Sequence, residues 1–327
     1  MGACATMMTS EFDLIKKYFN RPAPQTLLGV GDDAALISIT TGMELAVSTD
    51  MLVSGTHFLP DADPCQLGWK SLAVNLSDMA AMGAQPKWAT LAIALPQADE
   101  VWLEQFTNGF FACAKEFQVD LIGGDTTRGP LTISVQIMGE VPNGKALRRS
   151  GAKMGDEIWV SGDLGDAALA LAGLQNSFSL SKVELVTCLA ALHTPQPRVA
   201  LGLELRRIAH STIDISDGLV ADLGYILQSS DVGAEINLHD LPCSKIVSNY
   251  FADEQVQRMV LTGGDDYELC FTAPVEKHRE IRNLSKALGL PLSCIGRITS
   301  DRGLIIRGPD NGTINIKEAG FDHFFNR

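Results

Sequence analysis

Nine aspartates lie in short turns beside glycine or a hydroxyl residue, and these are the side chains best suited to do chemistry. The turns are spread along the chain: Gly31-Asp32-Asp33, Ser48-Thr49-Asp50, Ser77-Asp78, Gly123-Gly124-Asp125, Asp214-Ile215-Ser216-Asp217-Gly218 and Gly263-Gly264-Asp265-Asp266. Carboxylates in loops, with glycine allowing the backbone to approach a ligand, are typical of sites for hard cations. Clustered without cations, they would repel one another strongly. The repetition of one pattern favours convergence on Mg²⁺ over a scattered, solvated arrangement.

The motifs differ in how strongly each indicates a metal. Asp32 and Asp33, taken alone, fit an ordinary turn better than a ligand pair. The segment Ser48-Thr49-Asp50 follows a predicted strand, and it offers the hydroxyl and carboxylate oxygens that Mg²⁺ selects.

Two further motifs leave a structural alternative open. Asp78 lies in an otherwise apolar helical stretch, where a carboxylate usually has a partner. Asp214 and Asp217 bracket Ser216 at a predicted helix start, where N-capping is the alternative and does not exclude metal binding. Asp125 follows two glycines at the end of a predicted strand.

His57 lies in the loop Gly55-Thr56-His57-Phe58, seven residues beyond Asp50. A lone histidine in a loop is usually a surface residue, but its closeness to Asp50 makes contact with a substrate a reasonable hypothesis. The other histidines show no metal-ligand spacing.

A dinucleotide-binding turn is the main competing motif. The run from Gly29 to Ala34 formally fits G-x-G-x-x-A, with Asp50 at a suitable distance downstream. We reject it, because two aspartates would face the pyrophosphate and residues 39–42 interrupt the helix that the motif requires.

The elements that must position these turns alternate between helices and strands. Helical spacing predicts helices over residues 10–19, 64–82, 98–117, 165–174, 182–193, 197–209, 218–229, 244–260 and 275–289. Strands are expected over 43–49, 88–95, 119–123, 131–141, 157–161, 211–215, 234–238 and 268–273, with more up to 307, and the run 259–261 before Gly263 also resembles a strand. The pattern predicts an α+β fold: an N-terminal mixed sheet with helices and a C-terminal α/β domain.

Length and charge limit the function. A chain of 327 residues suggests two domains, and the turn-rich segment 142–151 places the boundary at 1–150 and 151–327. A net charge of −13 argues against nucleic-acid partners and would repel a phosphorylated substrate unless metal ions intervene.

The expected compartment is the cytoplasm. The seven cysteines are dispersed, odd in number and without a CxxC pair, as in reduced cytosolic proteins. The N-terminus lacks the pattern of a signal peptide, and the sequence has no apolar stretch that would span a membrane.

Together the motifs resemble, in order and spacing, the thiamine-monophosphate kinase family, within the superfamily of aminoimidazole-ribonucleotide synthetase and selenide, water dikinase. The resemblance covers essentially the whole chain, from Glu11-Phe12 to Gly320-Phe321-Asp322-His323-Phe324. It implies a two-domain fold whose N-terminal sheets form a barrel across a homodimer.

The resemblance also implies roles for individual residues. Mg²⁺ ions around the ATP phosphates would be held by Asp33, Ser48, Thr49, Asp50, Asp78, Asp125, Asp214 and Asp217, of which Asp50, Asp78 and Asp125 are the catalytic candidates. ATP would contact Gly124, Asp125, Arg149 and Ser216. Thiamine monophosphate would contact His57, Asp265 and Phe321. The chain departs from the family at Asp265, where we expect glutamate, and near Thr107, where we expect a tyrosine.

The implied reaction transfers the γ-phosphoryl group of ATP to thiamine monophosphate with the help of Mg²⁺. The attacking phosphate oxygen is already ionised at neutral pH, since the second pKa of a phosphate monoester is about 6. A general base is therefore unnecessary, in keeping with the lack of a base motif in the sequence.

Two alternatives stay open at this point. One is another ATP-dependent enzyme of the same superfamily, although no glycine-rich arm surrounds Cys4 as a selenophosphate-forming enzyme would require. The other is a non-catalytic protein that binds Mg²⁺ and nucleotide.

Overall fold

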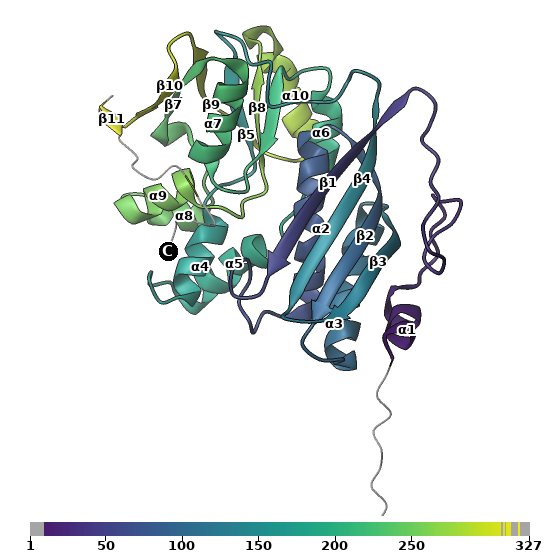
Figure 1. The fold of residues 1–327 in the computed structure, drawn as a ribbon. Helices are drawn as coiled ribbons and strands as arrows, with labels where there is room; N and C mark the ends of the chain where they lie inside the picture. The colour runs from purple at the N-terminus through teal and green to yellow at the C-terminus, as the bar shows by residue number, and fades with distance from the viewer. Residues whose placement is uncertain (1–9, 309, 311, 315–319, 321–327) are drawn as a thin grey trace, which may run out of the picture. The chain divides into compact units, whose positions relative to one another are not determined.

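The chain forms two compact units. The computed structural model describes residues 10–308, 310, 312–314 and 320. The first unit contains Met1–Asn75 and Pro86–Glu140, and the second contains Leu76–Gln85 and Val141–Arg327. Figure 1 draws both, and each is described here by itself.

A four-stranded sheet organises the first unit. Its strand order is β1-β4-β2-β3, with β2 and β3 parallel. The strands are β1 (Met43–Val53), β2 (Gln85–Leu95), β3 (Asp120–Arg128) and β4 (Thr132–Pro142). The helical elements are α1 (Glu11–Leu14), η1 (Ile15–Phe19), α2 (Pro64–Ala81) and α3 (Glu100–Glu116), and Figure 1 shows α2 running along the sheet.

Two glycines let α2 and α3 pack closely. A Cβ on Gly68 would lie 2.0 Å from the carbonyl oxygen of Phe106, and one on Gly109 would lie 1.8 Å from that of Cys65. No side chain fits at such distances, so the two helix backbones touch here. This contact fixes α3 against the helix that carries the Ser77-Asp78 motif.

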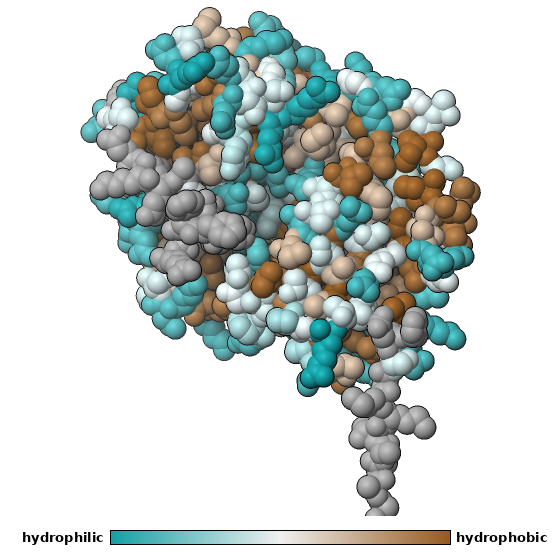
Figure 2. Space-filling view, in the orientation of Figure 1, coloured by the Kyte–Doolittle hydropathy of each residue, from teal (hydrophilic) through white to brown (hydrophobic). Residues whose placement is uncertain are grey.

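The edge strand β1 exposes apolar side chains. Leu45, Val47 and Met51 alternate along it and are 41%, 51% and 56% exposed. Figure 2 shows hydrophobic colour over this side of the first unit. Leu27 and Leu36, which precede β1 in the chain, are also exposed. Exposed apolar residues on an edge strand are typical of a surface that another chain covers.

A seven-stranded mixed sheet organises the second unit. Its order is β11-β10-β7-β9-β5-β8-β6, with β10 and β7 parallel and the other described pairings antiparallel. The strands are β5 (Glu157–Ser161), β6 (Ser211–Asp214), β7 (Gly233–Asn237), β8 (Leu269–Ala273), β9 (Leu292–Thr299), β10 (Gly303–Arg307) and β11 (Thr313–Ile314). The helices are α4 (Asp166–Leu174), α5 (Lys182–His193), α6 (Val199–Leu205), α7 (Leu219–Ser230), η2 (Leu238–Asp240), α8 (Lys245–Asn249), α9 (Glu254–Thr262), η3 (Val275–Lys277) and α10 (His278–Leu288).

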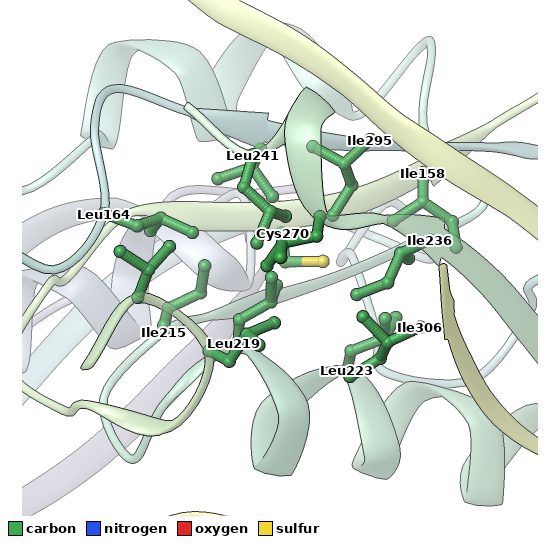
Figure 3. Packing of buried hydrophobic residues seen from close by; sticks show 14 of the residues in the cluster. Ile158, Leu164, Ile215, Leu219, Leu223, Ile236, Leu241, Cys270, Ile295 and Ile306 are labelled. Carbon is green, nitrogen blue, oxygen red and sulfur yellow. The ribbon is translucent and has the colours of Figure 1, made fainter. Parts of the chain in front are cut away.

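Helix α7 packs its apolar face on this sheet. Leu219, Leu223 and Ile226 follow helical spacing, and each is fully buried. Figure 3 shows Leu223 beside Ile306 of the sheet, with Ile236 close by. Full burial of one such side chain contributes about 1.5–3 kcal/mol to the free energy of folding. This packing holds the start of α7 against the sheet.

Most expected elements are present. Strand β5 and helix α5 have the bounds that the sequence predicted. At the start of α1, Ser10 and Asp13 form a reciprocal cap: Ser10 Oγ accepts from the Asp13 amide at 3.2 Å, and the Ser10 amide donates to Asp13 Oδ2 at 3.4 Å.

Three expectations about the acidic turns are wrong. Strand β1 continues to Val53 and β3 to Arg128, so Asp50 and Asp125 lie within strands rather than after them. The apolar run 259–261 belongs to helix α9, where Val256 and Val260 share the buried face. Backbone pairing continues both strands through residues whose polarity resembles that of a loop.

The cysteines that the structure describes are free thiols. Cys113 and Cys270 are fully buried, and burial raises the pKa of both, as it does for Cys188, whose pKa reaches about 12. Cys65 is exposed. Among the helices that the structure describes, none has the length and apolar character needed to cross a bilayer.

Candidate functional site

The turn between β6 and α7 is the most closely packed of the acidic motifs. Asp214 is the last residue of β6 and is only 5% exposed. Its Oδ2 accepts a hydrogen bond from the fully buried Ser77 Oγ, from the last turns of α2, at 2.7 Å. The structure thus brings together two predicted motifs that are 137 residues apart.

The segment 263–268 runs beside this turn. The amide of Asp265 donates to the Ser216 carbonyl at 2.9 Å, and the amide of Tyr267 donates to the Ile215 carbonyl at 2.8 Å. A Cβ on Gly264 would lie 2.5 Å from the Ser216 carbonyl oxygen, so only glycine permits this approach. The predicted substrate residue Asp265 therefore lies next to the predicted nucleotide residue Ser216.

Asp265 has an uncommon backbone conformation. Its φ is 70° and that of Tyr267 is 51°, both in the left-handed region. Tyr267 is buried, and its hydroxyl donates to Asp265 Oδ1 at 3.1 Å. The carboxylate is thus oriented by a tyrosine two residues away.

Gly320 lies beside the same turn. A Cβ on Gly320 would lie 2.7 Å from the Asp217 carbonyl oxygen and 2.6 Å from Ala221 Cβ. Phe321, the predicted aromatic contact for the substrate, lies outside the described residues, but its neighbour is fixed beside Asp217.

Arg149 belongs to a segment that borders β6. The Arg148 carbonyl accepts from the Thr212 amide at 2.9 Å. The Arg149 guanidinium lies over the Tyr225 ring of α7, 5.4 Å from its centroid. The ring face attracts the cation, which places the predicted nucleotide-binding arginine on the helix that begins at the Asp217 turn.

The buried carboxylate of Asp222 accepts hydrogen bonds from the amides of this turn. The sequence did not lead us to predict this residue. It is 2% exposed, and its Oδ2 accepts the amides of Ser216, Asp217 and Gly218 at 3.0, 3.0 and 3.1 Å. Burial, followed by the nearby charge of Asp214, raises the pKa of Asp222 to about 7, although the amides act in the opposite direction. The signal in the sequence was a carboxylate between Ala221 and Leu223 on an apolar helix, the criterion that had selected Asp78.

In the first unit, the backbone fixes Asp50. Its amide donates to Asn75 Oδ1 at 3.1 Å, and its carbonyl accepts from Ser134 Oγ at 3.3 Å. Because successive side chains of a strand point to opposite faces, Ser48 and Asp50 share one face. The Thr49 side chain lies on the other, so the motif does not present three side-chain oxygens together as the sequence suggested, and a Thr49 ligand would have to be its backbone carbonyl.

His57 follows β1 in a tight loop. Its Nδ1 accepts the Val53 amide at 3.0 Å, and its own amide donates to the Val53 carbonyl at 3.0 Å. A backbone amide can only donate, so Nδ1 carries a lone pair and the proton of the neutral ring is on Nε2. His57 therefore presents a hydrogen-bond donor.

Strand β3 carries Asp125 beside a required glycine. A Cβ on Gly124 would lie 1.8 Å from the Leu91 carbonyl oxygen, and its φ is 153°. Asp125 pairs with Ala92 across the ladder and is exposed. In the N-terminal loop, Asp32 Oδ1 accepts the Asp33 amide at 2.8 Å, and both residues are exposed.

The oxygen donors fit an ion shared with phosphates. Within the described part of the chain, no three His, Cys, Asp or Glu side chains are grouped so as to hold a metal ion. Mg²⁺ usually takes one or two carboxylates and completes its shell with water and substrate phosphates. The carboxylates of Asp214 and Asp217, three residues apart on one turn, fit that requirement, and they do not form a closed protein cage.

Family models match both parts of the chain. Residues 31–141 match the AIR synthase related protein, N-terminal domain, and residues 153–308 match the corresponding C-terminal domain. The chain is 49% identical to the thiamine-monophosphate kinase of Escherichia coli K12 over 322 residues, which are 97% of this chain and 99% of the relative. It is 33% identical to that of Bacillus subtilis over 324 residues, covering 96% and 99%.

Solved structures give the same result. The thiamine-monophosphate kinase of Stenotrophomonas maltophilia has a TM-score of 0.83 at 47% identity, covering 86% of this chain and 91% of that one. A structure described as AaThiL complexed with AMPPCP and TMP has a TM-score of 0.76 at 31% identity, covering 96% of each. The hydrogenase maturation protein HypE, at 22% identity and a TM-score of 0.75 with 92% and 95% covered, shares the fold alone.

Proposed function

The chain belongs to the thiamine-monophosphate kinase family, and from that premise we infer that it transfers the γ-phosphoryl group of ATP to thiamine monophosphate. The products are thiamine diphosphate and ADP. The AMPPCP and TMP of the similar AaThiL structure correspond to an ATP analogue and the acceptor.

One observation carries this conclusion: three predicted parts of the site meet at the β6–α7 turn. Ser216, the nucleotide residue, accepts a hydrogen bond from Asp265, the substrate residue. Gly320, next to Phe321, lies against Asp217, the metal residue. Donor, acceptor and metal contacts on one turn are what phosphoryl transfer between two phosphates requires.

In the second unit, Ser216 and Arg149 are proposed to contact ATP. Asp265 and Phe321 are proposed to hold thiamine monophosphate, and the Tyr267 hydroxyl orients the Asp265 carboxylate from 3.1 Å. Asp78, Asp214 and Asp217 are proposed to bind Mg²⁺.

In the first unit, Gly124 is proposed to contact ATP. Its missing side chain lets β3 pass close to Leu91 of β2, and Gly124 itself is exposed, so a polyphosphate can reach its backbone. His57 is proposed to donate its Nε2 proton to the acceptor phosphate, since Nδ1 already accepts from Val53. Mg²⁺ is proposed to bind at Asp33, Ser48, Thr49, Asp50 and Asp125.

When bound, Mg²⁺ would neutralise the phosphates and the charge that develops during transfer. The residues of the chain align the two substrates, so that one phosphate oxygen attacks in line with the leaving group. That oxygen is already ionised, because the second pKa of a phosphate monoester is about 6. No side chain has to remove a proton or to carry the phosphoryl group, and we expect inversion at the transferred phosphorus.

The test is ADP release with and without thiamine monophosphate. A kinase releases ADP only when the acceptor is present, whereas a binding protein shows no turnover in either case. ATP hydrolysis that ignores the acceptor would contradict the proposal.

Asp50→Asn tests the metal assignment in the first unit. Backbone groups of Asp50 hold the strand through Asn75 and Ser134, so the variant should fold. Turnover should fall below about a tenth of wild type, a change of at least ~1.4 kcal/mol. A higher residual kcat would remove Asp50 from the proposed metal ligands.

A homodimer is proposed on the exposed face of β1. Leu45, Val47 and Met51 form an apolar row on an edge strand, which a second copy would cover. Light scattering should report a dimer at micromolar concentration, and a monomer would contradict this. The need for ATP supports the cytoplasm as the compartment.

A further inference from the structure

A side chain of α7 accepts hydrogen bonds from the turn that precedes the helix. Helix N-termini normally offer their amide protons to a side chain that precedes the helix, or to a bound anion. Here the acceptor is Asp222, the fourth residue of α7, which reaches back to the amides of residues 216–218. These three amides are therefore already occupied by a carboxylate of the same chain.

The occupied amides determine what the turn can offer to a ligand. Since the N–H groups of Ser216, Asp217 and Gly218 point at Asp222, they do not serve as a phosphate cradle. The segment Ser216–Gly218 is left with its oxygen atoms, which suit a cation and not a bare phosphate.

The other side of the turn is equally restricted. A Cβ on Gly218, whose φ is 118°, would lie 2.7 Å from the Thr262 carbonyl carbon. The Ser216 carbonyl accepts the Asp265 amide at 2.9 Å. The backbone of Ser216 and Asp217 is therefore held from both sides, by Asp222 and by residues 262–265.

We propose that Asp222 is a positioning residue for the proposed metal site, which holds the Ser216–Gly218 backbone so that the turn binds Mg²⁺ and the Mg²⁺-bound nucleotide. This rests on the proposed function, because Asp217 and Ser216 are the ligands that it positions. Asp222 would act through these ligands, since its Oδ2 accepts the three amides of the turn. Outer partners of metal ligands typically change metal affinity by about 10–100-fold when they are replaced.

The experiment compares Asp222→Asn with Asp231→Asn. The first keeps the shape and leaves a neutral oxygen to accept the amides. The second is a matched control at the other end of α7, where Asp231 is exposed and pairs with Arg302 at 2.5 Å. For both variants we would measure the Mg²⁺ dependence of turnover, KM for each substrate, and the Tm.

For Asp222→Asn we expect the Mg²⁺ concentration for half-maximal activity to rise about tenfold, with KM for thiamine monophosphate within twofold of wild type. Saturating Mg²⁺ should restore most of kcat. Asp231→Asn should leave all of these values unchanged. Isothermal titration of Mn²⁺ with AMPPCP present, which involves no turnover, should show the same loss of affinity.

The outcomes separate the two proposals. A lowered Tm with an unchanged Mg²⁺ dependence and unchanged Mn²⁺ affinity would give Asp222 a structural role only and overturn the inference. If Asp222→Asn fails to fold, Asp222→Glu provides the test, since it keeps the charge but displaces the oxygen and should weaken Mn²⁺ binding. A wild-type chain that releases no ADP in the presence of thiamine monophosphate would overturn the proposed function instead.

Discussion

Glu140 in the first unit and Asp222 in the second are both buried carboxylates that accept three hydrogen bonds, yet their pKa values move in opposite directions. Glu140 accepts from the amide and hydroxyl of Thr40 and from Lys87 Nζ. Burial opposes its ionisation, but the bonds from Lys87 and Thr40 outweigh burial and lower the pKa of Glu140. For Asp222, burial and the charge of Asp214 raise the pKa to about 7.

The difference lies in the neighbouring charges. Lys87 neutralises Glu140 at 2.7 Å, so the pair stabilises the first unit by itself. The charges that act on Asp222 come from Asp214 and Asp217, and all three are negative. Burying a carboxylate among other carboxylates is unfavourable for folding. The second unit therefore has a cluster of negative charge that a bound cation would stabilise. Removing the carboxylate of Glu140 should therefore affect stability, whereas removing that of Asp214 should affect activity.

The largest effect is expected for Asp214→Asn. An asparagine still accepts from Ser77 Oγ, so the fold should persist, but a proposed metal ligand is lost. Turnover should fall about a thousandfold, or ~4 kcal/mol, while the Tm without Mg²⁺ stays equal to wild type or rises. An Asp214→Asn variant that keeps its activity but has a lower Tm would contradict the difference expected between Asp214 and Glu140.

Gly218→Ala tests how rigid the β6–α7 turn is. An alanine at φ 118° is strained and also meets Thr262, so we expect about 3 kcal/mol of lost stability. Gly289→Ala is the control, since Gly289 has φ 61° at the end of α10 and open space around it. Only backbone strain remains there, at about 1 kcal/mol. Denaturant unfolding measures both, and equal losses would mean that the turn is not tightly held.

Glu140→Gln is the counterpart of Asp214→Asn and should lower stability without changing kcat. The pKa of Glu140 is lower in the folded chain, so its stabilisation is complete above the unfolded value of about 4.3 and is lost as the pH falls through the folded value. The Tm difference between wild type and Glu140→Gln should therefore be largest at neutral pH and shrink as the solution is acidified. A Tm difference that grows on acidification would contradict the lowered pKa of Glu140.

Tyr267→Phe should have the smallest effect. It removes the hydroxyl that orients Asp265, a hydrogen bond of about 0.5–1.5 kcal/mol. KM for thiamine monophosphate should rise by a few fold, with KM for ATP and the Tm little changed. Equal increases in both KM values would indicate that the whole 263–268 segment has moved.

The sequence predicted most elements but not where some strands end. Polar residues at Ser48-Thr49-Asp50 and two glycines before Asp125 resemble loops, because hydrophobic periodicity stops there. Both segments are nevertheless strands, since backbone pairing such as that of Asp125 with Ala92 does not depend on side-chain polarity. The run 259–261 was too short to distinguish a strand from the helix that it forms.

Site residues could be predicted where they belong to a recognisable sequence motif. They could not be predicted where their role depends on the position of backbone groups in the folded chain. The Asp214 and Asp265 motifs were visible as patterns, and the structure brings them together. The role of Asp222 depends on three amides of a turn whose shape is set by Thr262 and Gly264. Such tertiary contacts leave no spacing rule in the sequence.

Labelling of the buried cysteines can report local unfolding of each unit. A thiol reacts with an alkylating reagent only as an exposed thiolate, and Cys113 of the first unit and Cys270 of the second are fully buried with raised pKa values. Each should be labelled only when its own unit opens, while the exposed Cys65 reports reagent access in the native state. Mass spectrometry of labelled peptides can therefore time the opening of the two units separately in the wild-type chain.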